Sequence, residues 1–192
     1  DVPQFIDRLA FNFLIGNYDN HGVNTAILLE ATGVRLAPQY DTLATVVYPR
    51  LSKNLAMKIS TQRQADQVTG RHWLELLQLC DLDSAQERQH LAELAEKVVA
   101  ALPRTRQDVA ASGTDHPVLD SIEANVKKRA DVLRGIPEYA GRQKERRKRN
   151  AVMDEEVRCE GVLDDGTVCN RVLYDEVSRQ RHRGYCCWNK GR

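Results

Sequence analysis

The chain has 192 residues, of which 42 % are hydrophobic and 29 % charged, with a formal net charge of +1 and a mean hydropathy of −0.52. This composition supports a hydrophobic core, and we expect one ordinary domain with a second, smaller unit. No stretch approaches the roughly 18 apolar residues that a membrane-spanning helix needs, and no signal peptide is visible. We therefore expect a cytoplasmic protein without membrane contact.

The N-terminal part predicts a helix followed by a hairpin. Residues 4–16 are apolar most of the way round a helix, so we expect this helix to be buried. The polar, turn-forming residues 17–24 come next. Residues 25–30 and 34–38 are short apolar runs on either side of a turn, which predicts a β-hairpin. Beyond the hairpin we expect an irregular segment up to about residue 60.

Three further helices are predicted before residue 140. The first begins near Arg71, and its apolar face includes Cys80, which we expect in the core. The second begins after Ser84, a typical N-cap residue that is followed three positions later by Glu87. The third covers about residues 118–133, where apolar positions recur with helical spacing.

The C-terminal part differs in composition. Residues 142–149 hold six basic side chains in eight positions, which indicates a solvated helix end or linker, or a contact with nucleic acid or another partner. Four of the five cysteines lie in the last 34 residues, and in a cytosolic protein that clustering favours metal binding over disulfides. The predicted organisation is a helical domain over 1–139, a basic linker over 140–156 and a cysteine-rich module over 157–192.

The clearest chemistry lies in the turn after the first helix and at the end of the hairpin. Phosphoryl transfer needs an oriented hydroxyl and cations that absorb the charge of the phosphates. Asp19 can accept the proton of a hydroxyl, while Asn24 and Asp41 can reach one metal ion with oxygen atoms that suit Mg²⁺. Each residue alone is a common turn residue, and a lone His21 is usually structural, so the prediction rests on their joint occurrence.

Two motifs at these positions resemble a known family. Gly-Asn-Tyr-Asp-Asn-His-Gly-Val-Asn at residues 16–24 looks like the catalytic loop of HipA-like serine/threonine protein kinases, with the pattern D-x-H-x-x-N. Leu-Ala-Pro-Gln-Tyr-Asp at residues 36–41 is similar to their metal-binding segment, L-x-P-x-Y-D. Leu-Ala-Met-Lys-Ile at residues 55–59 is similar to the L-A-x-K-I run that follows in that family. The resemblance covers about residues 1–139.

The resemblance implies a mainly α-helical, kinase-like C-terminal lobe with a small β-hairpin at the active site. Asp19 would be the general base, His21 would brace the loop through hydrogen bonds, and Asn24 and Asp41 would hold Mg²⁺ at an ATP site. Lys58 is a further candidate for cofactor binding, with an ordinary surface position as the alternative. The reaction would be ATP-dependent transfer of the γ-phosphate to a serine or threonine hydroxyl of a protein.

The same resemblance implies a toxin–antitoxin setting, with a DNA-binding antitoxin as partner and aminoacyl-tRNA synthetases as the associated substrate class. No nucleotide-binding lobe precedes Asp1, so we expect a fragment or a split kinase whose N-terminal lobe lies in the same or a separate chain. Such a protein would be inactive or poorly active alone. The alternatives are a catalytically silent lobe that docks a partner, and a nucleic-acid-binding module that acts through the basic linker and tail.

The cysteine-rich tail resembles small zinc knuckles of the form C…C-x-R…R-G-x-C-x-x-H. Asn189, a poor zinc ligand, stands where this pattern has its histidine, so another residue would have to complete the site. Four such ligands would hold Zn²⁺ and fold a segment too small for its own core. Free or oxidised thiols are the alternative. The candidate ligands are Cys159, Cys169, His182, Cys186 and Cys187.

Overall fold

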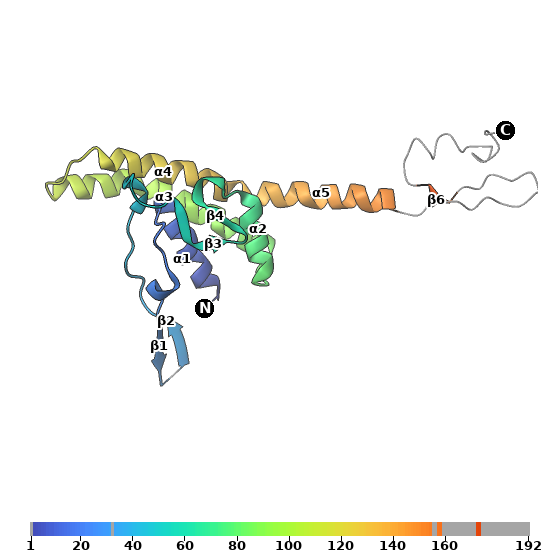
Figure 1. Cartoon of the computed structure of the whole chain (residues 1–192), viewed down its shortest axis with the longest axis horizontal. Coiled ribbons are helices and arrows are strands. Elements are labelled where there is room, and N and C mark those ends of the chain that lie inside the picture. Colours follow the sequence, from blue (N-terminus) through green and yellow to red (C-terminus); the bar gives the residue numbers. More distant parts are fainter. Residues whose placement is uncertain (1, 32, 155–156, 159–171, 174–192) are drawn as a thin grey trace, which may run out of the picture. The chain divides into compact units, whose positions relative to one another are not determined.

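The computed structural model of the chain describes residues 2–31, 33–154, 157–158 and 172–173 (Figure 1). It contains two compact units, Asp1–Ala140 and Gly141–Arg192, and the first carries the residues predicted for phosphoryl transfer. The candidate zinc ligands lie outside the described residues. These are Cys159, Cys169, His182, Cys186 and Cys187.

The described part of the chain is mainly helical, with short antiparallel strand pairs, as the sequence predicts. The elements in chain order are α1 (Val2–Ile15), the 3₁₀ helix η1 (Gly22–Asn24), β1 (Ile27–Glu30), β2 (Gly33–Leu36), η2 (Thr45–Val47), β3 (Asn54–Ile59), β4 (Gln62–Gln64), η3 (Ala65–Gln67), α2 (Gly70–Leu79), α3 (Ala85–Ala111), α4 (Val118–Arg134), α5 (Ile136–Asp154), β5 (Val157–Arg158) and β6 (Val172–Leu173).

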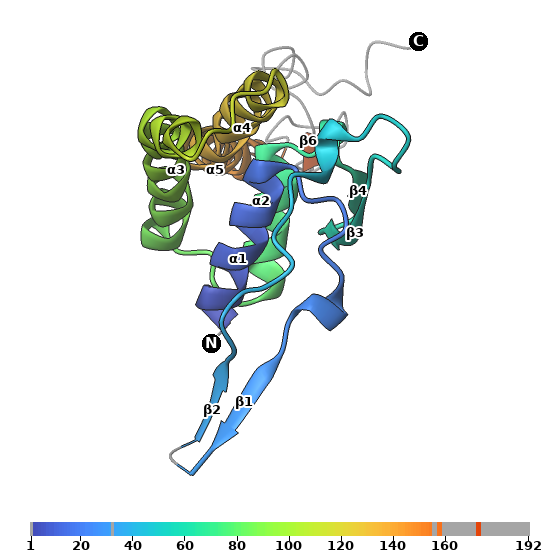
Figure 2. The ribbon, with the colours of Figure 1, turned by 90° about the vertical axis from the view of Figure 1, so that its left-hand side faces the viewer.

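The predicted hairpin is present as β1 and β2, with Ile27 opposite Leu36. It projects away from the helices of the first unit, and most of its side chains are exposed (Figure 2). A second hairpin, β3–β4, occupies part of the segment that we expected to be irregular, so that expectation is wrong. This segment forms a strand because Leu55 and Ile59 of β3 are buried in the core, while Lys58 between them is exposed to solvent.

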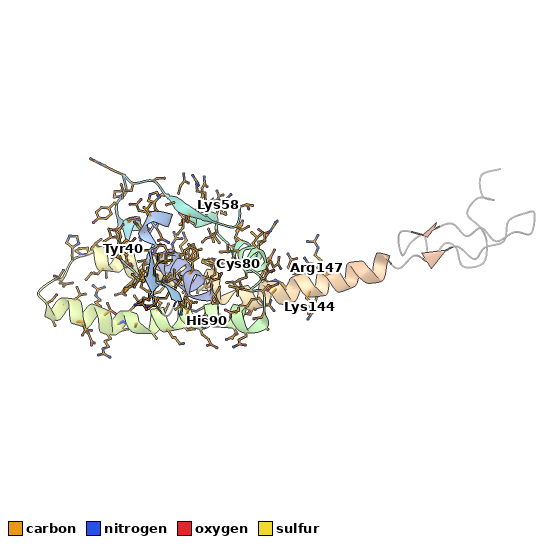
Figure 3. The ribbon with its side chains drawn as sticks, turned by 90° about the horizontal axis from the view of Figure 1, so that it is seen from below. Tyr40, Lys58, Cys80, His90, Lys144 and Arg147 are labelled. Atoms are coloured by element: carbon orange, nitrogen blue, oxygen red, sulfur yellow. The ribbon has the colours of Figure 1, made fainter. Side chains whose placement is uncertain are left out.

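The core forms where α1 packs against α3 and α4, with α2 and β3 completing it. The rings of Phe13 on α1 and Trp73 on α2 meet edge to face, with 5.6 Å between their centroids. Cys80, labelled in Figure 3, packs against this core, as the apolar face of its helix predicts. The largest fully buried side chains are Trp73, Leu14, Ile59, Leu77, Leu91, Leu133, Ile136 and Val126.

Two helices begin where the sequence predicts. The Ser84 side chain caps α3 by accepting a hydrogen bond from the Glu87 N–H at 3.0 Å, and α4 begins at Val118. The helix α3 continues through Pro103 to Ala111, further than its apolar pattern indicates. The basic run predicted as a linker lies within α5. No helix in the described part of the chain has the length and apolar content to cross a membrane.

Gly16 ends α1 and turns the chain toward the polar loop. Its φ of +79° lies in the left-handed region, where residues with a Cβ are strained. A Cβ at this position would stand 2.7 Å from Val46 Cβ and 2.8 Å from Asn125 Nδ2. The turn therefore requires glycine both for its backbone conformation and for its space.

We predict that Gly16→Ala destabilises the fold more than the same change at Gly113. Gly113 also has a positive φ, of +86°, but among the described residues no atom lies within 4 Å of the position that a Cβ would take, so it reports the backbone cost alone. The additional crowding at Gly16 should lower the free energy of unfolding by a further ~1–3 kcal/mol. Urea denaturation of both variants measures the difference, and equal losses would contradict the role of close packing at Gly16.

Candidate active site

The side-chain amide of Asn17 joins the two loops that carry the predicted functional residues. Its Nδ2 donates to Asn12 Oδ1 at 2.8 Å and to the backbone oxygen of Asp41 at 3.1 Å. Its Oδ1 accepts from the Asp19 N–H at 3.1 Å. Asn12 and Asn17 are each only 3 % exposed. Because buried amides need partners, these bonds hold residues 19 and 41 in a defined relation to α1.

The backbone around Tyr18 is held by neighbouring elements. The Thr45 hydroxyl, from η2, accepts from the Tyr18 N–H at 2.7 Å and donates to the Gly16 oxygen at 3.2 Å. The Ala56 N–H, from β3, donates to the Tyr18 oxygen at 2.8 Å. The loop that presents Asp19 is thus bound on both sides, although it belongs to neither a helix nor a strand.

The structure brings Asp19, Asn24 and Asp41 together. Asn24 Nδ2 donates to Asp41 Oδ2 at 2.6 Å and to the backbone oxygen of Asp19 at 3.3 Å. His21 Nε2 lies 2.8 Å from Asp19 Oδ1, a contact that fits the bracing role implied for this histidine. The Asp19 side chain is 67 % exposed, so its carboxylate is accessible to a substrate.

Asn24 and Asp41 are the residues that the sequence predicts to hold a metal ion. Their side chains touch, and together they offer an amide oxygen and carboxylate oxygens, the donors that Mg²⁺ prefers. No cluster of three or more His, Cys, Asp or Glu suited to a metal occurs among the described residues.

Lys58 is exposed on β3 and lies at the surface of the molecule in Figure 3. An open cleft of about 400 Å³ borders Asp19 and His21, and Lys58 is not among the residues that line it. Its role in cofactor binding stays a prediction.

Behind the loop, Arg129 of α4 carries a guanidinium group that is almost completely buried. Its Nη2 donates to Tyr18 Oη at 2.8 Å, its Nη1 to the Ala65 oxygen at 3.3 Å, and its Nε to Asn125 Oδ1 at 2.8 Å. The guanidinium also lies over the rings of Phe13 and Tyr18, 4.7 Å and 5.3 Å from their centroids. Arg129 thereby connects α4 to the residue that precedes Asp19.

The charge of Arg129 is balanced by Asp66, whose Oδ1 lies 3.6 Å from Nη2. A hydrogen bond from Lys128 is the main cause that lowers the pKa of Asp66 from its ordinary value. The carboxylate is therefore ionised at neutral pH, when its attraction to the buried guanidinium is present. Multiple hydrogen bonds and a nearby carboxylate are what a buried arginine needs to offset the cost of its desolvation.

Comparisons with known proteins show the family of this chain. The family model of the HipA-like C-terminal domain matches residues 1–105, more than half of the chain. The chain belongs to this family.

Two relatives show how much of a HipA-like protein the chain represents. A protein of Sinorhizobium fredii (strain NBRC 101917 / NGR234) named "Putative kinase Y4mE" is 29 % identical over 134 residues, which cover 70 % of this chain and 32 % of the relative. HipA of Shewanella oneidensis MR-1, solved in a complex with HipB and operator DNA, aligns with a TM-score of 0.60 and 17 % identity. That alignment covers 71 % of this chain and 33 % of HipA.

The chain therefore spans about a third of the length of these two proteins. At 17 % identity the likeness to HipA of Shewanella shows the fold alone. The match to the HipA-like domain ends at residue 105, before α4, so the contribution of Arg129 comes from a helix beyond the matched segment.

The sequence-based prediction missed the residues that support the site. Arg129 is surrounded in sequence by other charged residues, and nothing in composition distinguishes it. The spacing of Arg129 does distinguish it, because Arg129 lies three positions after Val126 and four before Leu133, and both of these residues are fully buried. A charged residue on the buried stripe of a helix indicates an internal partner, since burying an unpaired charge is costly.

We predict that Arg129→Met lowers the free energy of unfolding by ~2–4 kcal/mol, because Tyr18 Oη and the Ala65 oxygen lose a charged, buried donor. Lys127→Met, two residues earlier on the exposed face of the same helix, should cost less than ~1 kcal/mol. Urea denaturation compares the two variants. Similar small losses would show that Arg129 does not support the loop.

Proposed function

We propose that this chain is the C-terminal lobe of an ATP-dependent protein serine/threonine kinase. The observation that carries the proposal is the hydrogen-bonded connection of Asp19, Asn24 and Asp41 through two asparagine amides. Membership of the HipA-like family supports it. A carboxylate base beside a magnesium-binding pair is what phosphoryl transfer requires of a protein.

In this proposal Asp19 orients the hydroxyl of the substrate and accepts its proton as the oxygen bonds to the γ-phosphorus and the bond to ADP breaks. His21 keeps the Asp19 carboxylate in place through their 2.8 Å contact. Asn24 and Asp41 would hold Mg²⁺, which neutralises charge on the phosphates when it is bound. Lys58 would line the nucleotide site from β3.

A complete kinase also needs a lobe that covers the phosphates and supplies a lysine to them. The chain spans about a third of the two relatives, so this lobe would come from another part of the same polypeptide or from a separate chain. We propose that the 192 residues alone transfer phosphate poorly or not at all.

The partners are also proposals. HipA of Shewanella was solved with HipB and operator DNA, which supports an antitoxin and a nucleic acid as partners of this protein. The exposed basic side chains of α5, including Lys144 and Arg147 in Figure 3, provide a surface for phosphate contacts. A protein substrate of the aminoacyl-tRNA synthetase class follows from the family resemblance, and so does a cytoplasmic location.

Zinc binding by the tail remains part of the proposal. Cysteine thiolates with one histidine would hold Zn²⁺ tetrahedrally. Metal analysis of reduced protein should find about one zinc per chain if four ligands form a closed site. A content below half of that value would reject the zinc module.

We predict that Asp19→Asn and Asp41→Asn impair different steps. With an N-terminal lobe supplied, Asp19→Asn should lower kcat at least ~100-fold, because a general base contributes that much, while the affinity for Mg·ATP changes little. Asp41→Asn should weaken Mg·ATP binding, because the metal loses a charged ligand. Steady-state kinetics with radiolabelled ATP and direct nucleotide titration separate the two effects.

Asp81→Asn is a matched control for Asp41→Asn. Both aspartates are exposed and have a left-handed backbone, with φ of 56° for Asp81 and 53° for Asp41. Asp81 follows α2, where its N–H donates to the Gln78 oxygen, and it belongs to neither loop of the site. The control should leave turnover and nucleotide affinity unchanged. Full turnover by both the Asp19→Asn and the Asp41→Asn variants would reject the assigned roles.

A further inference from the structure

The cleft beside Asp19 is lined by a mixture of apolar, polar and charged groups. Leu55 and Ala56 of β3 line the cleft, and so does Leu51. Asp19 and His21 also line it, together with Arg63 of β4. Neither Asn24 nor Asp41 lines this cleft, so it borders the proposed base but not the proposed metal ligands.

The segment that supplies most of the cleft's lining residues is positively charged. Residues 42–65 include four basic side chains and no acidic one. Arg63 is exposed, and its guanidinium makes no ion pair with the described residues of the chain. By contrast, Lys53 lies close enough to Asp66 to contribute to lowering the pKa of that carboxyl. Arg63 thus lines the cleft with a positive charge that no carboxylate in the described part of the chain neutralises.

We propose that this cleft binds the substrate segment around the phosphorylated hydroxyl, and that Arg63 selects a segment with an acidic residue near that hydroxyl. The inference rests on the proposed kinase function, since it takes Asp19 as the base. A planar guanidinium pairs well with a carboxylate through two parallel hydrogen bonds. Leu51 and Leu55 give the remainder of an extended peptide an apolar surface to contact.

A peptide explains the cleft better than a nucleic acid does. A phosphodiester backbone repeats its negative charge and is recognised by several cations along a groove. Here one guanidinium lines the cleft together with the Asp19 carboxylate, which would repel a phosphate. A hydroxyl-bearing peptide satisfies both groups, because its hydroxyl donates to Asp19 and its acidic side chain meets Arg63.

Binding measured without ATP tests the inference independently of phosphate transfer. The probes are fluorescently labelled peptides with a central serine flanked by glutamate, by glutamine or by lysine, titrated against the 192-residue chain at low salt. We expect the glutamate peptide to bind at least ~10-fold more tightly than the glutamine peptide, as steering and pairing of opposite charges predict. Arg63→Gln should abolish this preference.

Charge reversal gives the sharpest comparison. Arg63→Glu should favour the lysine peptide over the glutamate peptide, which a general loss of folding would not produce. Lys53→Glu is the matched control, because Lys53 is exposed on the same segment but does not line the cleft. That variant should keep the preference for glutamate within about twofold, a change that corresponds to a small free energy.

Four results would overturn the inference. They are equal binding of the three peptides, no binding of any peptide, unchanged preference in Arg63→Glu, and displacement of the glutamate peptide by a short single-stranded RNA that binds through Arg63. An active kinase without acidic preference would reject this inference and leave the proposed function intact. A chain that selects glutamate through Arg63 yet transfers no phosphate when its N-terminal lobe is supplied would reject the proposed function and leave the binding preference of the cleft intact.

Discussion

The arrangement of the candidate site depends on one buried amide. Asn17 cannot leave its donor and acceptor atoms unpaired at 3 % exposure, and the partners it has are Asn12, Asp19 and Asp41. The two loops that carry the predicted base and metal ligand therefore meet at a point inside the protein, although the side chains of Asp19 and Asp41 themselves lie at the surface. The cost of leaving a buried polar atom without a partner is what keeps the loops together.

This constraint is supported from two sides. Thr45 and Ala56 hold the backbone of Tyr18 from η2 and β3, while Arg129 holds its hydroxyl from α4. Buried polar networks whose members are all satisfied are rigid, which suits the proposed nucleotide site, because its oxygen atoms would be held in fixed positions. The helix α4, beyond the part of the chain that matches the HipA-like domain, thus contributes to a loop that lies 111 residues earlier in the sequence.

The features that could be predicted from the sequence are those with a local physical signal. The cap at Ser84, the apolar spacing of α4 and the two apolar runs of the first hairpin each depend on neighbouring residues, and the structure contains all three. The proximity of Asp19, Asn24 and Asp41 was expected from their residue types and their order around the hairpin, and from the resemblance of two motifs to those of the HipA-like family.

Other features depend on contacts between distant residues, which one sequence does not reveal. The strand β3 is short, and only Leu55 and Ile59 mark its buried face, so its sequence pattern alone does not predict a strand. Its backbone is hydrogen-bonded to Tyr18, which is distant in the sequence. Asn17 reads as one more turn residue, because Asp41 lies 24 positions away. The apolar pattern that predicts α3 reaches only Leu102, and the last turns of this helix, from Pro103 to Ala111, continue without it.

The most direct test of the shared site asks whether Mn²⁺, a paramagnetic substitute for Mg²⁺, is held jointly by the two loops. In NMR spectra of isotope-labelled protein, Mn²⁺ should broaden the amide signals of residues 19, 24 and 41 together and before others. In a folded Asn17→Leu variant this joint broadening should be lost. Broadening of only one loop in the native chain, or identical broadening in the variant, would contradict the proposal that Asn17 holds the two loops together at a shared metal site.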